Sequence, residues 1–385
     1  MMTYDGQGNG FPPENNNYNN MNSSGNGYFQ QQYVQPSFVP MPVWAREKSY
    51  IRKLSLLAGG SILLYIIISG IYVAVFQGVS ALVESAGSKY APLFAAVTES
   101  SEFQYLFNTL YSIIAVGGPF FLLGYVFRKK GLSGDIPMGV PKKAGFLPVV
   151  VLAGFGMCFV GNIVTTYLDV FIEMLTGTGL ENLPLPETPR TPLGIILFFL
   201  STAVVPALIE EVALRGIIMQ PLRRYGDWYA IICSSLIFGL MHCNLVQIPF
   251  AIIAGVVIGY AVIVTESVWT GVLIHFLNNG FSVLVSIIAD FYGPDSIQSR
   301  ICNIVYYVIM VSGCACAYFV YKKFRDTPMK TSPLINSGKK FYGNPPLFSA
   351  RISQGKLYKA YIFTVPMIAA FAAVCYETVL VLMYS

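Results

Sequence analysis

The sequence predicts an all-α, polytopic helical membrane protein with about eight to nine transmembrane helices. Its 385 residues are 55% hydrophobic and only 11% charged, whereas soluble domains carry roughly 25% charged residues. The mean hydropathy is +0.59, and the apolar residues form continuous runs that approach the roughly 20 residues needed for a helix to cross a bilayer. An outer-membrane barrel would instead show short strands of alternating hydrophobicity. Low charge, high hydropathy and unbroken apolar runs together predict the fold class.

Residues 1–45 precede the first apolar run, and we expect them to form a disordered cytoplasmic tail. They are rich in Asn, Gln, Gly, Pro and Tyr, and such a composition buries too little apolar surface to offset the entropy lost on ordering. A solvated tail is favoured over a partner-binding arm. The tail has no apolar core followed by a cleavage site, so the sequence indicates no secretory signal peptide.

Nine apolar runs after the tail are candidate transmembrane helices. The fifth and sixth are separated only by a polar interval from Asn244 to Pro249, which we interpret as a tight turn. We therefore predict a helical membrane domain over 46–321, a cytoplasmic loop over 322–358 and an additional C-terminal transmembrane helix over 359–385. The nine runs cover approximately residues 54–77, 104–127, 145–171, 192–219, 228–245, 247–265, 268–289, 301–321 and 360–383.

The basic residues favour one orientation of these helices. With nine spans, the clusters of Lys and Arg beside the apolar runs all fall on one side, whereas the opposite loops hold only Lys89, Arg190 and Arg300. By the positive-inside rule, we expect an integral protein of the plasma membrane with its amino terminus in the cytoplasm. The basic residues flank the lipid bilayer, so the net charge of +5 does not indicate nucleic-acid binding.

Ionisable side chains inside the apolar runs are the candidates for chemistry, because they are costly in a membrane and usually face the interior of a helix bundle. In the fourth run, Glu211 and Arg215 are four residues apart, so we expect them to share a helix face and form an ion pair. Glu210 points about 100° away from Glu211 and is left as a free carboxylate. A purely structural charge network is the alternative interpretation of the two glutamates.

The two histidines of the chain both lie in apolar runs. Phe238 is four residues before His242, so we expect its ring to pack against that imidazole. Asn279 is four residues after His275, and its amide is expected to orient the imidazole or to donate to a developing oxyanion. We expect Asn278 to point elsewhere and to form an interhelical hydrogen bond. For a lone histidine, a structural bond to a backbone carbonyl is the alternative.

The three patterns Glu-Glu-x-x-x-Arg, Phe-x-x-x-His and His-x-x-x-Asn, each on its own apolar run, resemble the CPBP family of intramembrane proteases. This family includes eukaryotic CAAX prenyl endoproteases and bacterial bacteriocin-processing and immunity proteins. The resemblance covers about residues 192–290, a quarter of the chain, which we take as the protease core. It implies that Glu210 activates the attacking water and that Arg215 anchors Glu211.

The resemblance also implies roles for the histidines and the asparagine. His242 and His275 would assist catalysis or bind a metal ion, and Asn279 would help to form the oxyanion site. Zinc catalysis requires about three protein ligands and one open position, which the histidines and one glutamate would supply, but the chain has no His-Glu-x-x-His pattern. We therefore favour a metal-free, glutamate-type mechanism over a zinc metalloendopeptidase.

The leading hypothesis is an intramembrane endopeptidase that hydrolyses a peptide bond of a membrane-associated peptide or protein, which by family analogy is prenylated. One alternative is a non-catalytic immunity or scaffold protein that binds a partner in the bilayer. Another is a proton-coupled transporter in which the glutamates and histidines form a relay. The sequence has no convincing internal repeat, which counts against a transporter built from symmetric halves.

Overall fold

The computed structural model describes residues 43–85, 90–142, 144–176, 188–243, 247–325 and 354–384, and every regular element in these ranges is helical. The predicted all-α fold class is therefore confirmed. Most of the predicted tail (1–45) and of the predicted loop (322–358) lies outside the described residues, as does the Asn244 end of the predicted turn.

The described helices include long α-helices, short 3-10 turns and the π-helical segments η1, η3 and η4. In chain order they are α1 (Val43–Ser85), α2 (Ala91–Thr98), α3 (Ser101–Tyr111), η1 (Ser112–Gly117), α4 (Gly118–Lys129), η2 (Ala144–Phe146), α5 (Leu147–Thr176), α6 (Pro192–Phe199), η3 (Leu200–Val204), α7 (Val205–Glu211), η4 (Val212–Ile218), α8 (Met219–Leu222), η5 (Arg223–Tyr225), α9 (Asp227–Leu240), α10 (Gln247–Thr265), α11 (Val268–Tyr292), α12 (Ile297–Phe324), α14 (Gln354–Ile362) and α15 (Val365–Tyr384).

Seven helical spans in the described residues are long and apolar enough to cross a membrane. An eighth is added if α14 and α15, which are bent by 70° relative to each other, count as one broken span. The fifth predicted run is shorter than expected, because α9 has only 14 residues, about 21 Å of helix against a hydrocarbon thickness of about 30 Å. The seven spans are Glu47–Ser85, Ser101–Lys129, Ala144–Phe171, Pro192–Tyr225, Gln247–Thr265, Val268–Tyr292 and Ile297–Phe324.

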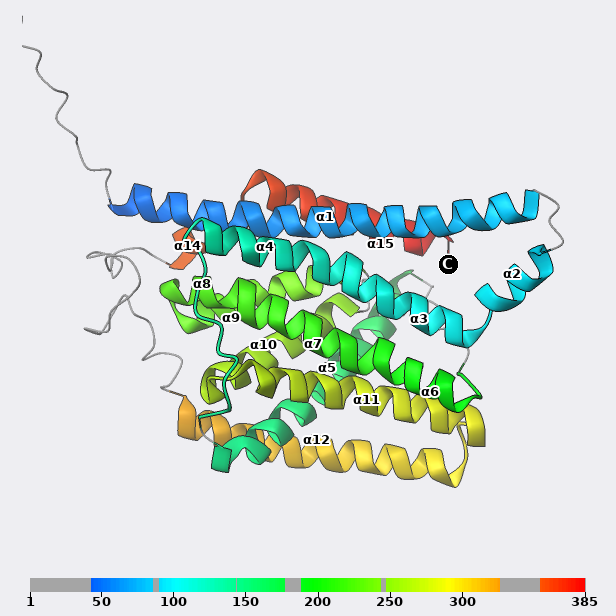
Figure 1. Ribbon diagram of the computed structural model, residues 1–385. Helices are drawn as coiled ribbons and strands as arrows, with labels where there is room; N and C mark the ends of the chain where they lie inside the picture. Colours follow the sequence, from blue (N-terminus) through cyan, green and yellow to red (C-terminus); the bar gives the residue numbers. More distant parts are fainter. Residues whose placement is uncertain are drawn as a thin grey trace, which may run out of the picture. The chain divides into compact units, whose positions relative to one another are not determined.

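The helices α9 and α10 pack against each other as an antiparallel hairpin (Figure 1). Their close approach depends on a small residue: a Cβ atom on Gly255 would lie 2.9 Å from the Cβ and Oγ atoms of Ser235. The chain reverses after α9, where Cys243 has a φ of +48°. The tip of this hairpin therefore carries His242, one of the candidate site residues.

The remaining helices surround this hairpin. Figure 1 shows α1 and α15 along one side and α12 on the opposite side, with α7, α9, α10 and α11 between them. The helix α5 packs against α10, α11 and α12. Gly156 of α5 and Gly313 of α12 meet where a Cβ atom on either would lie within 2.7 Å of the other's backbone, and such small residues let membrane helices pack closely. Buried apolar side chains such as Phe120, Leu214 and Ile231 fill the interior.

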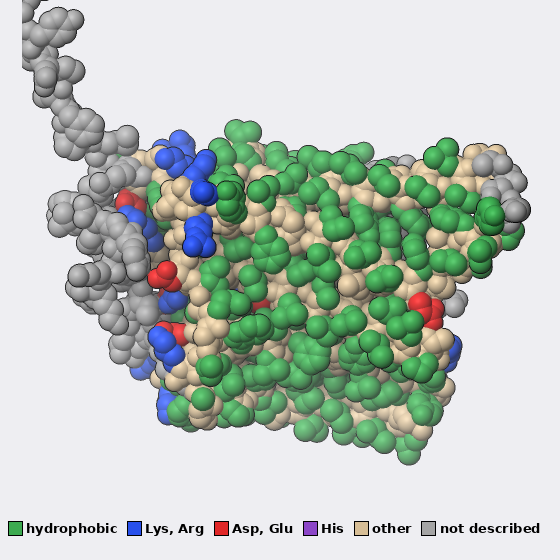
Figure 2. All heavy atoms as spheres, in the orientation of Figure 1, with side chains coloured by type: hydrophobic (Ala, Val, Ile, Leu, Met, Phe, Trp, Pro, Cys, Tyr) green, Lys and Arg blue, Asp and Glu red, His purple; other side chains and the backbone are tan. Residues whose placement is uncertain are grey.

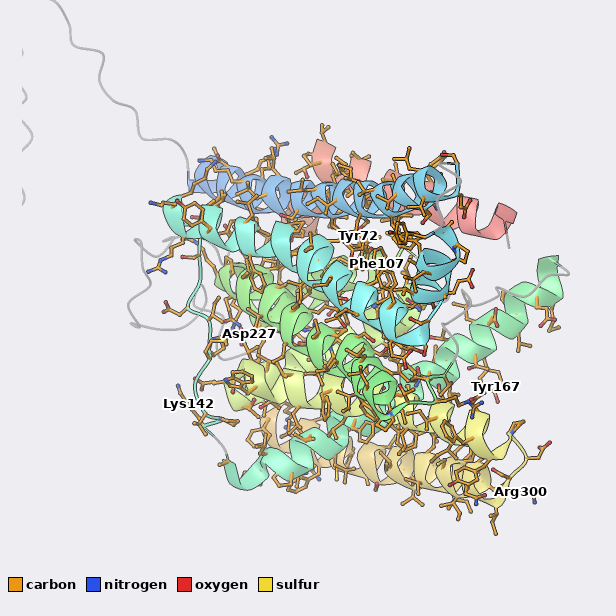
Figure 3. The ribbon with its side chains drawn as sticks, turned by 45° about the vertical axis from the view of Figure 1, so that its right-hand side comes forward. Tyr72, Phe107, Lys142, Tyr167, Asp227 and Arg300 are labelled. Atoms are coloured by element: carbon orange, nitrogen blue, oxygen red, sulfur yellow. The ribbon has the colours of Figure 1, made fainter. Side chains whose placement is uncertain are left out.

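Basic side chains gather at one end of the helix bundle, as Figure 2 shows for the visible face. Lys142 lies at this end and Arg300 at the other (Figure 3). At the basic end, Arg224 forms an ion pair of 2.8 Å with Glu47, and the Tyr225 hydroxyl donates to the same carboxylate at 2.9 Å. This distribution agrees with the positive-inside pattern, and the side of the membrane that this end faces stays a prediction.

Candidate active site

The span Pro192–Tyr225 contains π-helical segments on both sides of α7. Such segments are rare in proteins, and those that occur are often found at functional sites. Pro206 has no N–H, so the carbonyl oxygen of Thr202, four residues earlier, lacks its α-helical donor. The Nδ2 atom of Asn279 in α11 donates to that oxygen at 2.9 Å. The irregular part of this span is thus bonded to α11 beside the candidate site.

Glu211 and Arg215 form the expected ion pair, with Arg215 Nη1 donating to Glu211 Oε1 at 2.9 Å. Both side chains are shut off from solvent, with exposed fractions of 0% and 1%. The guanidinium also donates to the carbonyl oxygen of Gly255 at 3.3 Å and lies 4.7 Å from the centre of the Phe238 ring. Removing either charge would leave the other buried without its opposite charge, which is strongly unfavourable.

The same carboxylate oxygen binds a histidine from another span. His275 Nδ1 lies 2.9 Å from Glu211 Oε1. An ionised carboxylate only accepts hydrogen bonds, so Nδ1 carries a proton and Nε2 is left for other contacts. That Nε2 atom is 3.9 Å from Oε2 of Glu210. The imidazole is therefore oriented by Glu211, and the expectation that Asn279 orients it is wrong, because a contact between two spans replaces the contact within one helix turn.

A glycine on α11 makes room for the Glu211 carboxylate. A Cβ atom at Gly271 would lie 2.9 Å from Glu211 Oε2 and 2.9 Å from Val262. Distances under 3.0 Å force something to move, and Arg215 and His275 both hold the carboxylate in place. Gly271 is therefore required at this point of helix contact.

His242 faces the site from the tip of the α9–α10 hairpin. Its Nδ1 atom lies 2.8 Å from the carbonyl oxygen of Phe238, so Nδ1 donates and Nε2 is the free nitrogen. The Phe238 ring centre lies 5.0 Å from that of His242 and 5.9 Å from that of His275. The expected packing of Phe238 against His242 is confirmed, and the same ring also contacts the second imidazole.

Asn279 and Asn278 form a short chain of carboxamides. Asn279 donates to Thr202 as described above, and Asn278 Nδ2 donates to Asn279 Oδ1 at 3.0 Å. Asn278 lines the same cavity as Asn279, contrary to the expectation that it points elsewhere. Asn278 follows His275 by three residues, and residues three and four apart both share a helix face.

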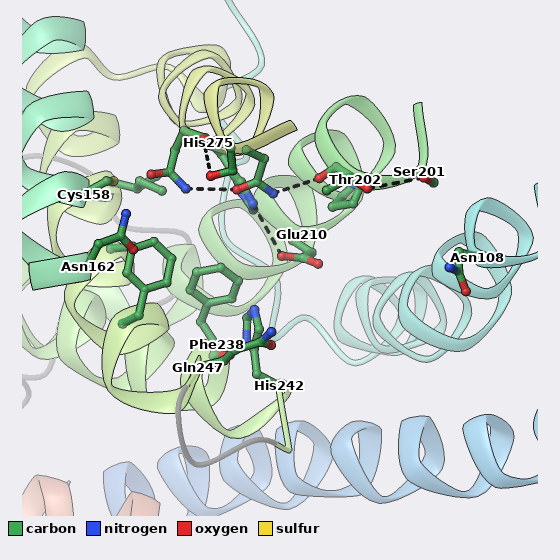
Figure 4. A pocket seen from close by; sticks show the side chains of 17 residues that line it. Asn108, Cys158, Asn162, Ser201, Thr202, Glu210, Phe238, His242, Gln247 and His275 are labelled. Carbon is green, nitrogen blue, oxygen red and sulfur yellow. Dashed lines mark hydrogen bonds and ion pairs between the residues drawn. The ribbon is translucent and has the colours of Figure 1, made fainter. Parts of the chain in front are cut away.

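One cavity of about 390 Å³ contains the free polar ends of these groups. Figure 4 shows Glu210, His242 and His275 around it, and the side chain of Glu210 is 17% exposed. Glu211 and Arg215 lie behind its wall and do not line it. The cavity is also lined by polar residues that lie outside the three motifs. Of these residues, only Thr202 has a sequence signal, which is its position four residues before Pro206. These additional residues are Asn108, Asn162, Ser201, Thr202, Gln247 and Ser282.

The donor groups of the described cavity residues determine whether the cavity could hold a metal ion. Within the described ranges, no group of three or more His, Cys, Asp or Glu side chains is arranged to hold one. Two imidazole nitrogens are already bonded, His242 Nδ1 to a carbonyl and His275 Nδ1 to a carboxylate. The remaining Nε2 atoms and Glu210 do not form a compact set of ligands. The residues present do not fit the three-ligand zinc site considered from the sequence.

Comparison with known proteins gives one match. Residues 192–281 match the family described as Rce1-like, type II CAAX prenyl endopeptidase Rce1-like. The matched segment runs from the start of α6 into α11 and includes all three motifs. The search of curated proteins finds no match, and neither does the search of solved structures. The family match confirms the resemblance drawn from the motifs.

Proposed function

We propose that this chain, a member of the CPBP family of CAAX-type intramembrane proteases, hydrolyses a peptide bond of a membrane-associated peptide with water activated by Glu210. The observation that carries the proposal is that Glu210 of α7, His242 of the turn after α9 and His275 of α11 line a single cavity. The family match supports a hydrolase that acts on peptide bonds. The roles of individual residues are part of the proposal.

Glu210 acts as the general base. It is the glutamate of the pair that reaches the cavity and has no neighbouring cation in its own helix turn, whereas Glu211 is buried against Arg215. A carboxylate within hydrogen-bond reach of a bound water can take its proton. Glu210 takes a proton from water, the hydroxide adds to the carbonyl carbon, and the same proton passes to the leaving amine when the C–N bond breaks.

The imidazoles and Asn279 assist this reaction. Each imidazole has a fixed Nδ1 atom, so its Nε2 atom can bind the attacking water or exchange a proton with the leaving amine. Asn279 Nδ2 carries two hydrogens, and Thr202 uses one of them. The second is available to the oxyanion, and one such donor contributes about 10²–10³ to kcat in known sites.

The substrate class follows from the family description and the position of the cavity among apolar helices. We propose a membrane-associated peptide, prenylated as in the CAAX-type reaction, that reaches the cavity from the bilayer. The basic end of the bundle then faces the cytoplasm, in accordance with the positive-inside rule. In this proposal the membrane domain is 46–321 with its protease core at 192–290, and the helix at 359–385 is an addition.

Cleavage by the purified protein in liposomes tests the proposal. The probe is a fluorogenic farnesylated peptide with a CAAX carboxyl terminus. Glu210→Gln is expected to reduce kcat by about 10²–10⁴, the usual contribution of a general base. The matched control is Glu266→Gln, because Glu266 is an exposed partner of Lys142; it should retain full activity. Unchanged cleavage by folded Glu210→Gln protein would remove Glu210 from the mechanism.

A further inference from the structure

The directions of the two carboxamides beside His275 are fixed by a backbone carbonyl. The Thr202 oxygen can only accept, so Asn279 must turn its Nδ2 atom toward it, at 2.9 Å. The Oδ1 atom of Asn279 then faces Asn278, which must offer Nδ2, at 3.0 Å. Because the Nδ2 atom of Asn278 is turned toward Asn279, its Oδ1 atom must point away from Asn279.

This remaining oxygen has no hydrogen-bond partner among the described residues. The Asn278 residue is only 6% exposed and lines the cavity that contains Glu210 and His275. A buried acceptor without a donor is unfavourable, because it has lost its bond to water and gained none in return. The oxygen is closed off from the cavity space by its neighbours in this structure, so a ligand donor that displaces those neighbours would give it the hydrogen bond that it lacks.

We propose that Asn278 is a substrate-binding residue whose Oδ1 atom accepts a main-chain N–H of the peptide, next to the bond that is cleaved. This inference rests on the proposed function and extends it to recognition of the peptide backbone. Asn278 follows His275 by three residues, a rise of about 4.5 Å along the helix. A peptide group bound there lies adjacent to the one that reaches His275.

Other side chains of the cavity fit the same class of ligand. Asn108 of α3, Asn162 of α5 and Gln247 of α10 also line it. A carboxamide has the same carbonyl and N–H groups as a peptide bond, so it can pair with either edge of an extended chain. Asn278 differs from these residues because its direction is fixed and its acceptor is buried.

Ester substitution in the peptide tests the proposal directly. The probes are the farnesylated CAAX peptide and analogues in which one non-scissile N–H at a time is replaced by oxygen, which removes the donor and keeps the shape. Binding is measured by fluorescence anisotropy with the Glu210→Gln protein, in which hydrolysis is blocked. We expect one analogue to bind about three- to tenfold more weakly, the effect of one neutral hydrogen bond.

Asn278→Leu in the same background is expected to reduce this penalty to less than twofold. Ser282→Ala is the matched control: Ser282 also lines the cavity, but its hydroxyl donates to the Asn278 backbone carbonyl at 3.2 Å. This control should keep the penalty. Asn278→Asp at pH 3 or below, under the ordinary aspartic acid pKa of about 3.9, is a conservative variant, because its protonated carboxyl group has both a donor for Asn279 and an acceptor for the peptide. It should keep the penalty even if Asn278→Leu does not fold.

The outcomes separate the two proposals. Ester penalties that are the same with and without Asn278→Leu, or that Asn278→Asp abolishes, would overturn the role of Asn278, and cleavage by the unaltered protein would still support the protease. A penalty that depends on Asn278 in a protein that binds but never cleaves the peptide would support Asn278 and overturn the protease. A protein that binds none of the peptides would overturn both.

Discussion

His275 and Glu211 are joined by a hydrogen bond of 2.9 Å between Nδ1 and Oε1, across 64 residues of the chain. The same Oε1 atom accepts from Arg215, so one buried oxygen holds an imidazole and a guanidinium together. Serine protease triads use a buried carboxylate in a related way to fix the tautomer of a histidine. We therefore assign Glu211 a positioning role, with Glu210 as the group that touches the reacting water.

Arg215→Met is expected to destabilise the protein by about 3–5 kcal/mol, because it leaves the charge of Glu211 buried without its cation. Thermal unfolding of the purified protein in detergent measures the effect. The double variant Glu211→Leu with Arg215→Met removes both charges, and it should recover most of the stability. Its peptidase activity should stay low, because His275 has lost the acceptor for Nδ1. A single variant as stable as the unaltered protein would contradict this account of the pair.

Gly271→Ala is expected to lower kcat about tenfold or more by displacing the Glu211 carboxylate, since the new methyl group would lie 2.9 Å from Oε2. A shift of about 1 Å in a catalytic group can cost about 10²-fold in rate. Gly280→Ala on the same helix is the control, because the nearest atoms to its Cβ lie at 3.7 and 3.9 Å. The control should be fully active and equally or more stable, as alanine favours helix by about 1 kcal/mol over glycine. Equal activity of the two variants would show that the contact at Gly271 is unimportant.

Chelation is expected to leave peptidase activity unchanged, because the described side chains offer no suitable three-ligand group. The purified protein is dialysed against EDTA, and its metal content is measured by mass spectrometry before and after. Activity that falls on dialysis and returns with Zn²⁺ would mean that the cavity rearranges to bind the ion.

Cysteine labelling checks the orientation of the chain. A membrane-impermeant maleimide added to intact cells is expected to label Asp295→Cys, which precedes α12 at the end of the bundle that carries Arg300. It should not label Ser23→Cys in the predicted cytoplasmic tail until the cells are opened. The reverse pattern would invert the topology, and labelling of neither position in opened cells would mean that the sites are inaccessible to the reagent.

The fold could be predicted because long apolar runs have few alternatives to membrane helices. The exceptions have local causes. The fifth run is a short helix because the chain turns back at His242. The last run is bent before Pro366, which cannot donate a backbone hydrogen bond and lies in the first turn of α15. The Ser55 hydroxyl of α1 bonds to the Tyr361 carbonyl at this break, a contact that no local pattern predicts.

The candidate site could be predicted where its contacts lie within one helix turn. The pairs Glu211–Arg215 and Phe238–His242 are both four residues apart, a spacing that predicts contact on one helix face. The partner of His275 was missed because Glu211 lies on another span, and spacing within one helix gives no information about such a contact. Asn278 also lies beside His275, because the third residue after a given position shares its helix face as the fourth does.

The missing N–H of Pro206 has an effect on a neighbouring helix. The Thr202 carbonyl, which Pro206 deprives of its α-helical donor, fixes the Asn279 amide, and that amide fixes Asn278. A proline ring thus determines which atom of the Asn278 amide is left for a ligand. The direction of each hydrogen bond is passed from the Thr202 carbonyl through two uncharged carboxamides. Selectivity at this point of the wall would then derive from the backbone of the fourth span and not from a charged side chain.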